Sequence, residues 1–405
     1  MKVALVHDYL REFGGAERVL EALSELYPDA PIYTAFFKED SEAYKRFKYK
    51  KIITSWAQHI PFFATKLHSP LRFLAPFIWG SFNFSKYDVV ITSAGWYITK
   101  GVIRNKQPFD KTQGKQATSN KKPIEFCYCH TPPRWLYGYK TAVGYQKYLL
   151  VRIYAHIIGH FMRLYDFTAA QKVDFFIANS KEVQARIKKF YRRDSVVIYP
   201  PVSLPRGPVT RSFPASAPAS LAKAANAVRA VGSPPTRATP PSYYFIVSRL
   251  VGPKGIDLAI EAAKKLGFRL KIAGIASGYG SVTTESAENI EFLGFVSDEE
   301  LVSLYKNAKA FLALAEDEDF GITPVEAMWC GTPVIAYYGG GYKETVVDGK
   351  TGVFFKEQSA ESLILAIKRF ETLKIKAEDC KKQAEKFSKE RFKKEIKAFI
   401  EKNTE

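Results

Sequence analysis

Short apolar runs alternate along the chain with longer segments whose apolar residues recur at helical spacing. Runs rich in Val, Ile and Phe are typical of parallel strands buried on both faces, and the segments between them are typical of crossover helices. The pattern occurs twice, so each half of the chain predicts an α/β fold. The expected strands are 3–6, 88–92, 124–129, 175–178 and 196–198 in the first series and 244–247, 270–273, 310–314 and 334–336 in the second.

Helical spacing is clearest in the second half, where we expect helices over 256–266, 298–307, 324–330 and 360–370. From 377 to 402 the sequence alternates Lys and Glu and carries Phe387, Phe392, Ile396 and Ile400 at helical spacing. This pattern predicts one amphipathic C-terminal helix with a solvated charged face.

Two polar insertions divide the pattern. Residues 203–242 are rich in Pro, Ala and Ser, contain several basic residues and no acidic one, and have few large apolar groups. Such a composition predicts a linker or a surface insertion. A second basic insertion, 105–122, interrupts the first series. The expected organisation is an N-terminal domain (1–202), the linker (203–242), a C-terminal domain (243–385) and a C-terminal helix (386–405).

Composition narrows the class of protein. The 405 residues are 46% hydrophobic, which is enough for two cores. The net charge of +19 favours phosphate, nucleic acid or an anionic membrane as partners without choosing among them. Four cysteines without a CxxC motif argue against a disulfide scaffold or a zinc module. The apolar windows 60–80 and 148–167 are interrupted by charges, so we expect a cytoplasmic protein that is soluble or peripherally bound to the inner face of the cell membrane.

The first half offers two candidate ligand contacts. Gly14 and Gly15 stand between the opening strand and a helix, where backbone N–H groups can approach a diphosphate. The full GxGxxG motif is absent, and an ordinary tight turn is the alternative. His130 follows the strand 124–129, at the edge where α/β sheets place their ligands, although a lone histidine is often structural.

Two cations follow the first strand of the second half. Arg249 and Lys254 lie between that strand and the next helix. A guanidinium and an ammonium at such a junction suit a diphosphate that lies across the carboxyl ends of the strands. A pair of surface cations is the alternative.

The acidic stretch 316–327 contains Glu318 and Glu326 eight residues apart. Thr323 is the expected N-cap of a helix with Pro324 at its first position, so Glu326 could complete a capping box. Gly321 allows close backbone approach of a ligand, and two carboxylates can accept the paired hydroxyls of a sugar and a ribose. Metal binding competes, but no histidine is near and the spacing fits no calcium loop.

Together these segments resemble the retaining glycosyltransferase family 4, and within it bacterial mannosyltransferases that build surface polysaccharides. The likeness implies the GT-B architecture, two Rossmann-like domains facing across a cleft. It covers nearly the whole chain apart from the insertions, while the loop 273–278 departs from the family's GxGP form. The segments are Gly14-Gly15, YDVVITS (87–93), YCHTPPRWLYGY (128–139), IANSKEV (177–183), SRLVGPKG (248–255), FLGFVSDEEL (292–301) and EDFGITPVEAMWCGTPVIA (318–336).

The resemblance also implies roles. Glu318 would face the donor sugar, Glu326 would hold the ribose hydroxyls, and the two cations would neutralise the diphosphate without a metal ion. Backbone N–H groups of 320–322 would bind sugar or phosphate, and the two N-terminal glycines would border the diphosphate. Catalysis is thereby assigned to Glu318, His130, Arg249 and Lys254, and donor binding to Gly14, Gly15, Arg249, Lys254, Glu318, Phe320, Gly321, Ile322 and Glu326.

The implied reaction transfers a sugar with retention of anomeric configuration by a front-face route, without a cofactor. GDP-mannose is the expected donor, and a UDP-sugar is the alternative. The acceptor would be a glycan or a lipid-linked sugar. Basic residues at 45–51 and aromatic residues at 56–84 suit an anionic membrane surface, unless they are a solvated charge run beside core aromatics. A nucleic-acid-binding α/β protein is the competing class, favoured only by the charge and the basic insertions.

Overall fold

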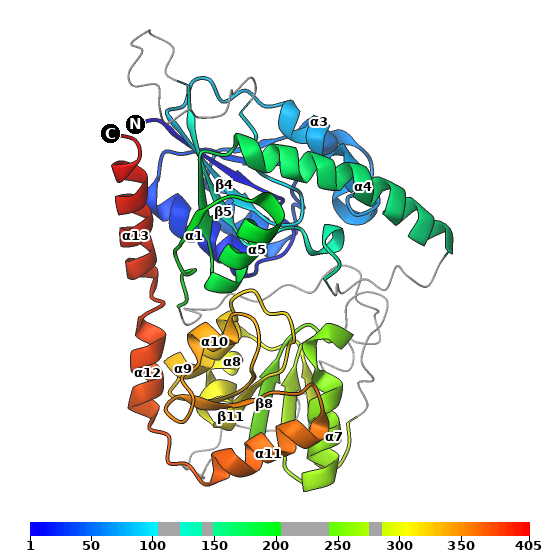
Figure 1. Cartoon of the computed structure of the whole chain (residues 1–405), viewed down its shortest axis with the longest axis vertical. Coiled ribbons are helices and arrows are strands. Elements are labelled where there is room, and N and C mark those ends of the chain that lie inside the picture. The colour runs from blue at the N-terminus through cyan, green and yellow to red at the C-terminus, as the bar shows by residue number, and fades with distance from the viewer. Residues whose placement is uncertain (104–121, 140–148, 204–242, 275–285) are drawn as a thin grey trace. The chain divides into compact units, whose positions relative to one another are not determined.

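The computed structural model describes residues 1–103, 122–139, 149–203, 243–274 and 286–405. They form two compact units, each built on one parallel sheet (Figure 1). The first unit contains the described residues up to 201 together with 389–405, and the second contains those between 202 and 388. The expected insertions 105–122 and 203–242 lie outside the described residues, except for Lys122 and Ser203.

The first unit has a seven-stranded sheet in the order β3-β2-β1-β4-β5-β6-β7. Its register matters for the site, because His7 and Ser93 are paired on neighbouring strands and Ala94 pairs with Cys129, the residue before His130. The strands are β1 (Val3–His7), β2 (Ile32–Thr34), β3 (Ile52–Thr54), β4 (Val89–Ala94), β5 (Ile124–Cys129), β6 (Phe175–Ala178) and β7 (Ser195–Val197).

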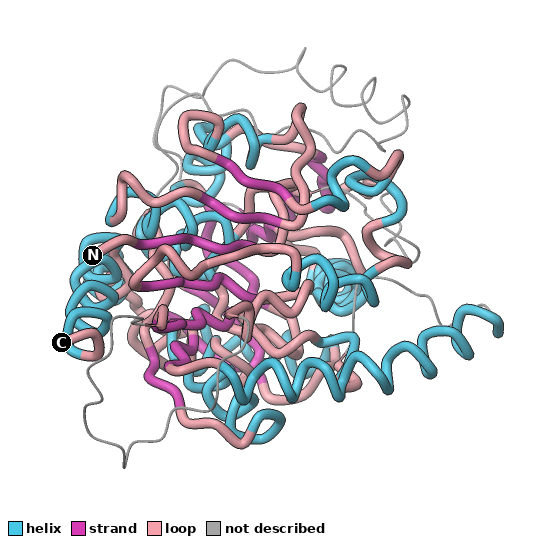
Figure 2. Tube along the Cα trace, turned by 90° about the horizontal axis from the view of Figure 1, so that it is seen from above, coloured by secondary structure: helices cyan, strands magenta, loops and turns pink. Residues whose placement is uncertain are grey.

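Both faces of this sheet are buried. Val3 and Leu5 of β1 belong to one hydrophobic cluster and Ala4 and Val6 to another, because successive side chains of a strand point to opposite faces. Residues of α1 (Gly15–Leu26) and α13 (Lys389–Lys402) complete the first cluster, and residues of α3 (Ala75–Gly80) and α4 (Leu149–Lys172) complete the second. The helices accordingly run along the outside of the sheet (Figures 1 and 2).

The second unit has a six-stranded sheet in the order β10-β9-β8-β11-β12-β13. Helices α7 (Ile256–Leu266) and α11 (Ala360–Glu371) share a hydrophobic core with it, while α12 (Ala377–Glu385) packs on α9 (Ile322–Trp329). The remaining elements are α8 (Asp298–Lys306), β8 (Tyr243–Val247), β9 (Leu270–Ala273), β10 (Ile290–Gly294), β11 (Ala308–Ala313), β12 (Val334–Tyr337) and β13 (Gly352–Phe355).

Every strand expected from the sequence overlaps a strand of the structure, but β2, β3, β10 and β13 were not predicted. Three of these four lie at sheet edges, and β2 has only three residues. Edge strands are partly solvated, so β3 and β10 lack the continuous apolar run that marks a buried parallel strand.

The prediction of one C-terminal helix over 377–402 is wrong. The chain forms α12 and α13, and residues 386–388 between them are not helical. The apolar positions serve two cores: Phe387 packs on Phe320 with ring centroids 5.3 Å apart, whereas Phe392, Ile396 and Ile400 are buried in the first unit. The terminal helix thus begins at Lys389 and is a core element of the first unit.

Candidate functional site

Two opposite charges meet at the carboxyl edge of the second sheet. Lys254 ends the short helix η6 (Gly252–Lys254) after β8, and Glu318 lies in the loop after the neighbouring strand β11. Lys254 Nζ donates to Glu318 Oε2 over 2.7 Å, and the two side chains remain 29% and 22% exposed. Arg249, in the loop that precedes η6, is exposed. Loops at this edge carry the ligand sites of open α/β sheets, so these three groups are placed to meet a bound anion or hydroxyl.

A glycine run that sequence reasoning missed holds Glu318 in place. Residues 339–341 follow β12, and Gly341 N donates to Glu318 O over 2.9 Å. A Cβ at Gly340, whose φ is +50°, would lie 2.2 Å from the same carbonyl oxygen. The hydroxyl of Tyr342 also reaches Glu318 Oε2, at 3.5 Å. Three consecutive glycines, two residues after the predicted strand 334–336, were the available signal.

The helix after Glu318 begins earlier than the sequence predicted. Its N-cap is Gly321 at φ +87°, its first residue is Ile322, and no side chain caps it, so the predicted Thr323 cap with Pro324 at the first position is wrong. A Cβ at Gly321 would lie 2.7 Å from the Tyr342 ring, and this close approach, with the positive φ, requires glycine. Phe320 is buried.

Glu326 lies inside the second unit. It is 1% exposed, and Tyr305 donates its hydroxyl to Glu326 Oε2 over 3.0 Å. Thr332 in turn donates to the backbone carbonyl of Tyr305 over 2.6 Å. Because α9 begins at Ile322, Glu326 stands at the fifth helical position, which excludes the capping box.

The first unit carries a hydrogen-bonded chain of four side chains at the carboxyl ends of β1, β4 and β5, which is buried except at His130. Glu17 Oε1 lies 3.3 Å from His7 Nε2, His7 Nδ1 lies 3.0 Å from Ser93 Oγ, and Ser93 Oγ lies 2.8 Å from His130 Nε2. The sheet register produces this chain, because it pairs His7 with Ser93 and places His130 beyond the next strand. Of the four residues only His130 was singled out from the sequence.

Burial decides the charge of His130. Together with the neighbouring His7, it lowers the pKa of His130 to about 3, so the ring is neutral near pH 7. A neutral imidazole has one N–H donor and one acceptor nitrogen, and the Ser93 hydroxyl can complement either one at Nε2. Because Nε2 contacts Ser93, a ligand hydroxyl would meet His130 at Nδ1.

Neighbouring residues hold both ends of this chain. The side-chain amide of Asn179, in the IANSKEV segment, donates to His130 O over 2.9 Å. At the other end, Gly14 N donates to Glu17 Oε2 over 2.8 Å, at the start of α1. Gly14 has extended φ and ψ, so its backbone does not demand glycine there, and a Cβ would lie 3.3 Å from the carboxylate. Gly15 is the first residue of α1.

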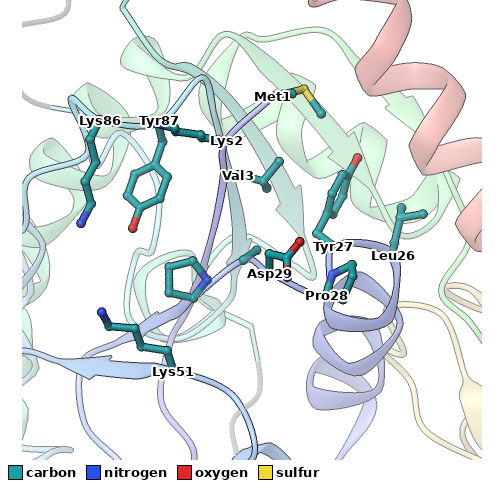
Figure 3. A pocket seen from close by; sticks show the side chains of 12 residues that line it. Met1, Lys2, Val3, Leu26, Tyr27, Pro28, Asp29, Lys51, Lys86 and Tyr87 are labelled. Atoms are coloured by element: carbon teal, nitrogen blue, oxygen red, sulfur yellow. The ribbon is translucent and has the colours of Figure 1, made fainter.

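A hollow of about 580 Å³ opens at the opposite edge of the first sheet (Figure 3). Lys2 and Val3, at the amino end of β1, line it together with Lys51, Lys86 and Tyr87. It contains none of the predicted site residues, and the amino edge is not where open α/β sheets bind ligands. In the described ranges, no three His, Cys, Asp or Glu side chains form a metal-binding group.

Comparisons with known proteins indicate the family that this chain resembles. Residues 234–387 match the family model described as Glycosyl transferases group 1. An uncharacterized glycosyltransferase of Methanocaldococcus jannaschii, MJ1178, is 30% identical over 158 residues, which are 37% of this chain and 45% of that protein. The chain thus spans less than half of that relative.

Solved structures agree over the full length. The lipopolysaccharide outer core galactosyltransferase WaaB in its apo form matches with a TM-score of 0.61 at 17% identity, over 100% of both chains. HepE from Anabaena, in complex with UDP and glucose, matches with a TM-score of 0.63 at 17% identity, over 99% of both. The two parallel sheets and these matches show that the chain has the GT-B fold.

Proposed function

We propose that the protein is a retaining glycosyltransferase that moves mannose from GDP-mannose onto a glycan or a lipid-linked acceptor of a cell-surface polysaccharide or glycolipid. The observation that carries the proposal is the partly exposed Lys254–Glu318 pair, held at the sheet edge by glycine backbone inside the region that matches Glycosyl transferases group 1. A cation there suits a diphosphate, and a fixed carboxylate suits sugar hydroxyls.

In the proposed reaction, the bond between the anomeric carbon and the diphosphate oxygen breaks as the acceptor oxygen forms its bond on the same face. The acceptor proton passes to the departing diphosphate. Lys254 and Arg249 stabilise the negative charge that develops there, without a metal ion or other cofactor, and this electrostatic contribution is the largest one that we assign. Glu318, released from Lys254 as the diphosphate takes its place, accepts hydrogen bonds from the donor sugar.

The other predicted contacts take supporting roles in this proposal. Backbone N–H groups of Phe320, Gly321 and Ile322 bind the sugar or phosphate, and Glu326 with Tyr305 contributes to the ribose site. From the first domain, Gly14 and Gly15 border the diphosphate, and His130 offers its Nδ1 to a sugar hydroxyl.

The donor is tested by thermal unfolding with GDP, with UDP and without nucleotide. A ligand that binds only the folded protein at ~100 times its dissociation constant adds roughly 2.7 kcal/mol. We expect selective stabilisation by GDP. Stabilisation by UDP alone would favour the alternative, a UDP-sugar donor, which the complex of HepE with UDP and glucose supports. No stabilisation by either would contradict the proposal and favour nucleic-acid binding.

Transfer itself is tested with matched variants. Glu318→Gln and Lys254→Ala should each lower the rate of transfer about 100-fold, because each removes an electrostatic contact to the reacting groups. Lys264→Ala, at an exposed position of α7, is the control and should keep the wild-type rate. The anomeric configuration of the product, read by NMR, tests retention; an inverted product would contradict the mechanism.

We also propose that the protein attaches peripherally to anionic lipid, as a lipid-linked acceptor requires. Of the aromatic residues at 56–84, Phe63, Trp79, Phe82 and Phe84 are buried in the core, whereas Trp56, Phe62 and Phe77 are exposed. Only the exposed part of this segment can therefore contribute to a surface that meets lipid.

A further inference from the structure

Helix α4 exposes a continuous apolar face. Leu149, Ile153, Ile157, Phe161 and Leu164 follow one another at intervals of three or four residues, so they share one side of the helix. All five side chains are 49–67% exposed. The long helix α4 runs along the outside of the first unit, and its N-terminal turns extend beyond the sheet (Figure 1). We call this side the outer face of α4.

The opposite side of α4 is anchored. Ile158, Met162, Tyr165 and Ala169 pack in the hydrophobic core shared with α3 and the sheet. An ordinary surface helix combines such a buried stripe with a polar outer side. Here both sides are apolar, and large aliphatic and aromatic residues repeated over four turns are more than the scattered exposed apolar residues of a monomeric protein.

Two stretches of sequence surround the outer face, and both carry positive charge and contain no carboxylate. No Asp or Glu occurs between Glu125 and Asp166, nor between Glu42 and Asp88. The two stretches meet, because the hydroxyl of Tyr154 donates to Pro70 O. Two exposed cations adjoin the apolar residues, Arg152 on α4 and Lys66 on the adjoining segment. His156 and His160 of α4 are also exposed, and His160 lies on the outer face itself, between Ile157 and Leu164.

The combination of exposed apolar residues and neighbouring positive charge indicates what binds the outer face of α4. A second copy of the chain would bring the same cations to the contact, in a protein whose net charge is +19. An anionic lipid surface offers phosphate to the basic residues and hydrocarbon to the apolar ones. No described helix is long and apolar enough to span a membrane. A helix that lies in the membrane plane buries its apolar side to a depth of about 5–10 Å, which suits side chains of this size.

We propose that the outer face of α4 is the lipid-binding surface and inserts into an anionic bilayer leaflet. The inference deepens the proposed peripheral attachment, and it rests on the proposed function only in taking the acceptor to be lipid-linked. The aromatic residue Phe62, 70% exposed and held at φ +61°, adds an exposed apolar side chain on the adjoining segment.

The test is sedimentation of the full-length protein with phosphatidylcholine vesicles that contain or lack phosphatidylglycerol. The wild type should sediment with the anionic vesicles, and less so as the salt concentration rises. Leu164→Glu and Ile157→Glu should each lower the partition coefficient about tenfold or more, because each places a carboxylate in the inserted face. Leu365→Glu is the matched control: a leucine on α11, in the other unit, that is at least as exposed as the two α4 residues and whose replacement should leave binding unchanged.

Three outcomes would overturn the proposal: equal recovery of the wild type in the supernatant with both kinds of vesicle, unchanged binding of the two α4 variants, or loss of dimerisation by these variants without loss of vesicle binding. The last outcome, read by light scattering, would assign the face to a second copy. Nucleotide stabilisation, measured on the same variants, separates the two proposals. If the α4 variants lose vesicle binding but keep nucleotide stabilisation, the result supports the lipid-binding proposal. If nucleotide stabilises none of the variants, the result contradicts only the proposed activity.

Discussion

The buried link between His7 and His130 depends on one hydroxyl group. Ser93 Oγ lies 3.0 Å from His7 Nδ1 and 2.8 Å from His130 Nε2. A chain of this kind fixes ring orientation and tautomer, as in other sites where one partner of a histidine decides which nitrogen meets the ligand. We therefore regard Ser93 as a positioning residue for His130.

Ser93→Ala should cost about 1–3 kcal/mol of stability, because it leaves ring nitrogens buried without a partner. The variant should also lose the single tautomer of His130 that the contact with Ser93 selects, which ¹⁵N chemical shifts of labelled histidine report directly. The control is Ser195→Ala, which removes a buried hydroxyl that makes no hydrogen bond in the described part of the chain and should be nearly neutral. A wild-type tautomer pattern in Ser93→Ala would refute the positioning role.

At the scale of elements, the loop after β12 and the loop after β11 fit together backbone to backbone. Gly340 has φ +50° and stands where a Cβ would be 2.2 Å from Glu318 O. Gly349 has a similar φ of +72°, but nothing lies within 4 Å of its Cβ position. Alanine variants at these two glycines therefore separate the cost of backbone strain, which both share, from the cost of displacing the Glu318 loop, which only Gly340 has.

Gly349→Ala should cost about 1–2 kcal/mol from the left-handed backbone alone. Gly340→Ala should cost more than that, because the added methyl must also push the Glu318 carbonyl away. Only the second variant should lose nucleotide stabilisation. Urea unfolding and thermal shifts with GDP measure the two effects, and equal losses in both variants would exclude a role for the contact with Glu318.

Elements with a strong local pattern could be predicted. The strand Ile124–Cys129 and the helix Ile256–Leu266 have the bounds that the sequence indicated, because a continuous apolar run and a 3.6-residue period are local signals. The start of α9 was placed two residues late, since the N-cap is a glycine without a capping side chain. The break at 386–388 depends on two separate cores, which no local pattern encodes.

The residues of the candidate site likewise include some that a local sequence pattern indicated and some that it did not. Lys254 was singled out by its position between a strand and a helix, and Glu318 by its spacing to Glu326 on either side of Gly321, but their mutual contact was not predicted. His7 and Ser93 were missed because their meeting depends on strand register, which pairs residues 86 positions apart. Register is a property of the folded sheet and has no signature within either strand.

At the scale of the whole molecule, two neutral histidines of the first unit couple its stability to pH. Burial, and then Arg11 and Arg72, lower the pKa of His68 to about 3. His130 has a pKa of about 3 for a related reason, burial beside His7. In the unfolded chain both titrate near 6.5. Between pH 6.5 and pH 3 the unfolded chain therefore binds protons that the folded unit does not, so these groups make stability fall as the pH falls.

Acidification from pH 7 to pH 5 should consequently destabilise the first unit by about 2 kcal/mol for each of these histidines, since one pH unit below the unfolded pKa corresponds to about 1.4 kcal/mol. Burial raises the pKa of Asp8, so the contribution of that carboxyl to the pH dependence has the opposite sign. Urea unfolding at pH 7 and pH 5, followed by tryptophan fluorescence, reports mainly on this unit, which holds four of the five tryptophans. Between pH 7 and pH 5, the free energy of unfolding of His68→Gln should fall by about 2 kcal/mol less than that of the wild type.

The control is His59→Gln, at an exposed position, which should show the same fall as the wild type. If His68→Gln also shows the wild-type fall, His68 is not held neutral in the folded unit.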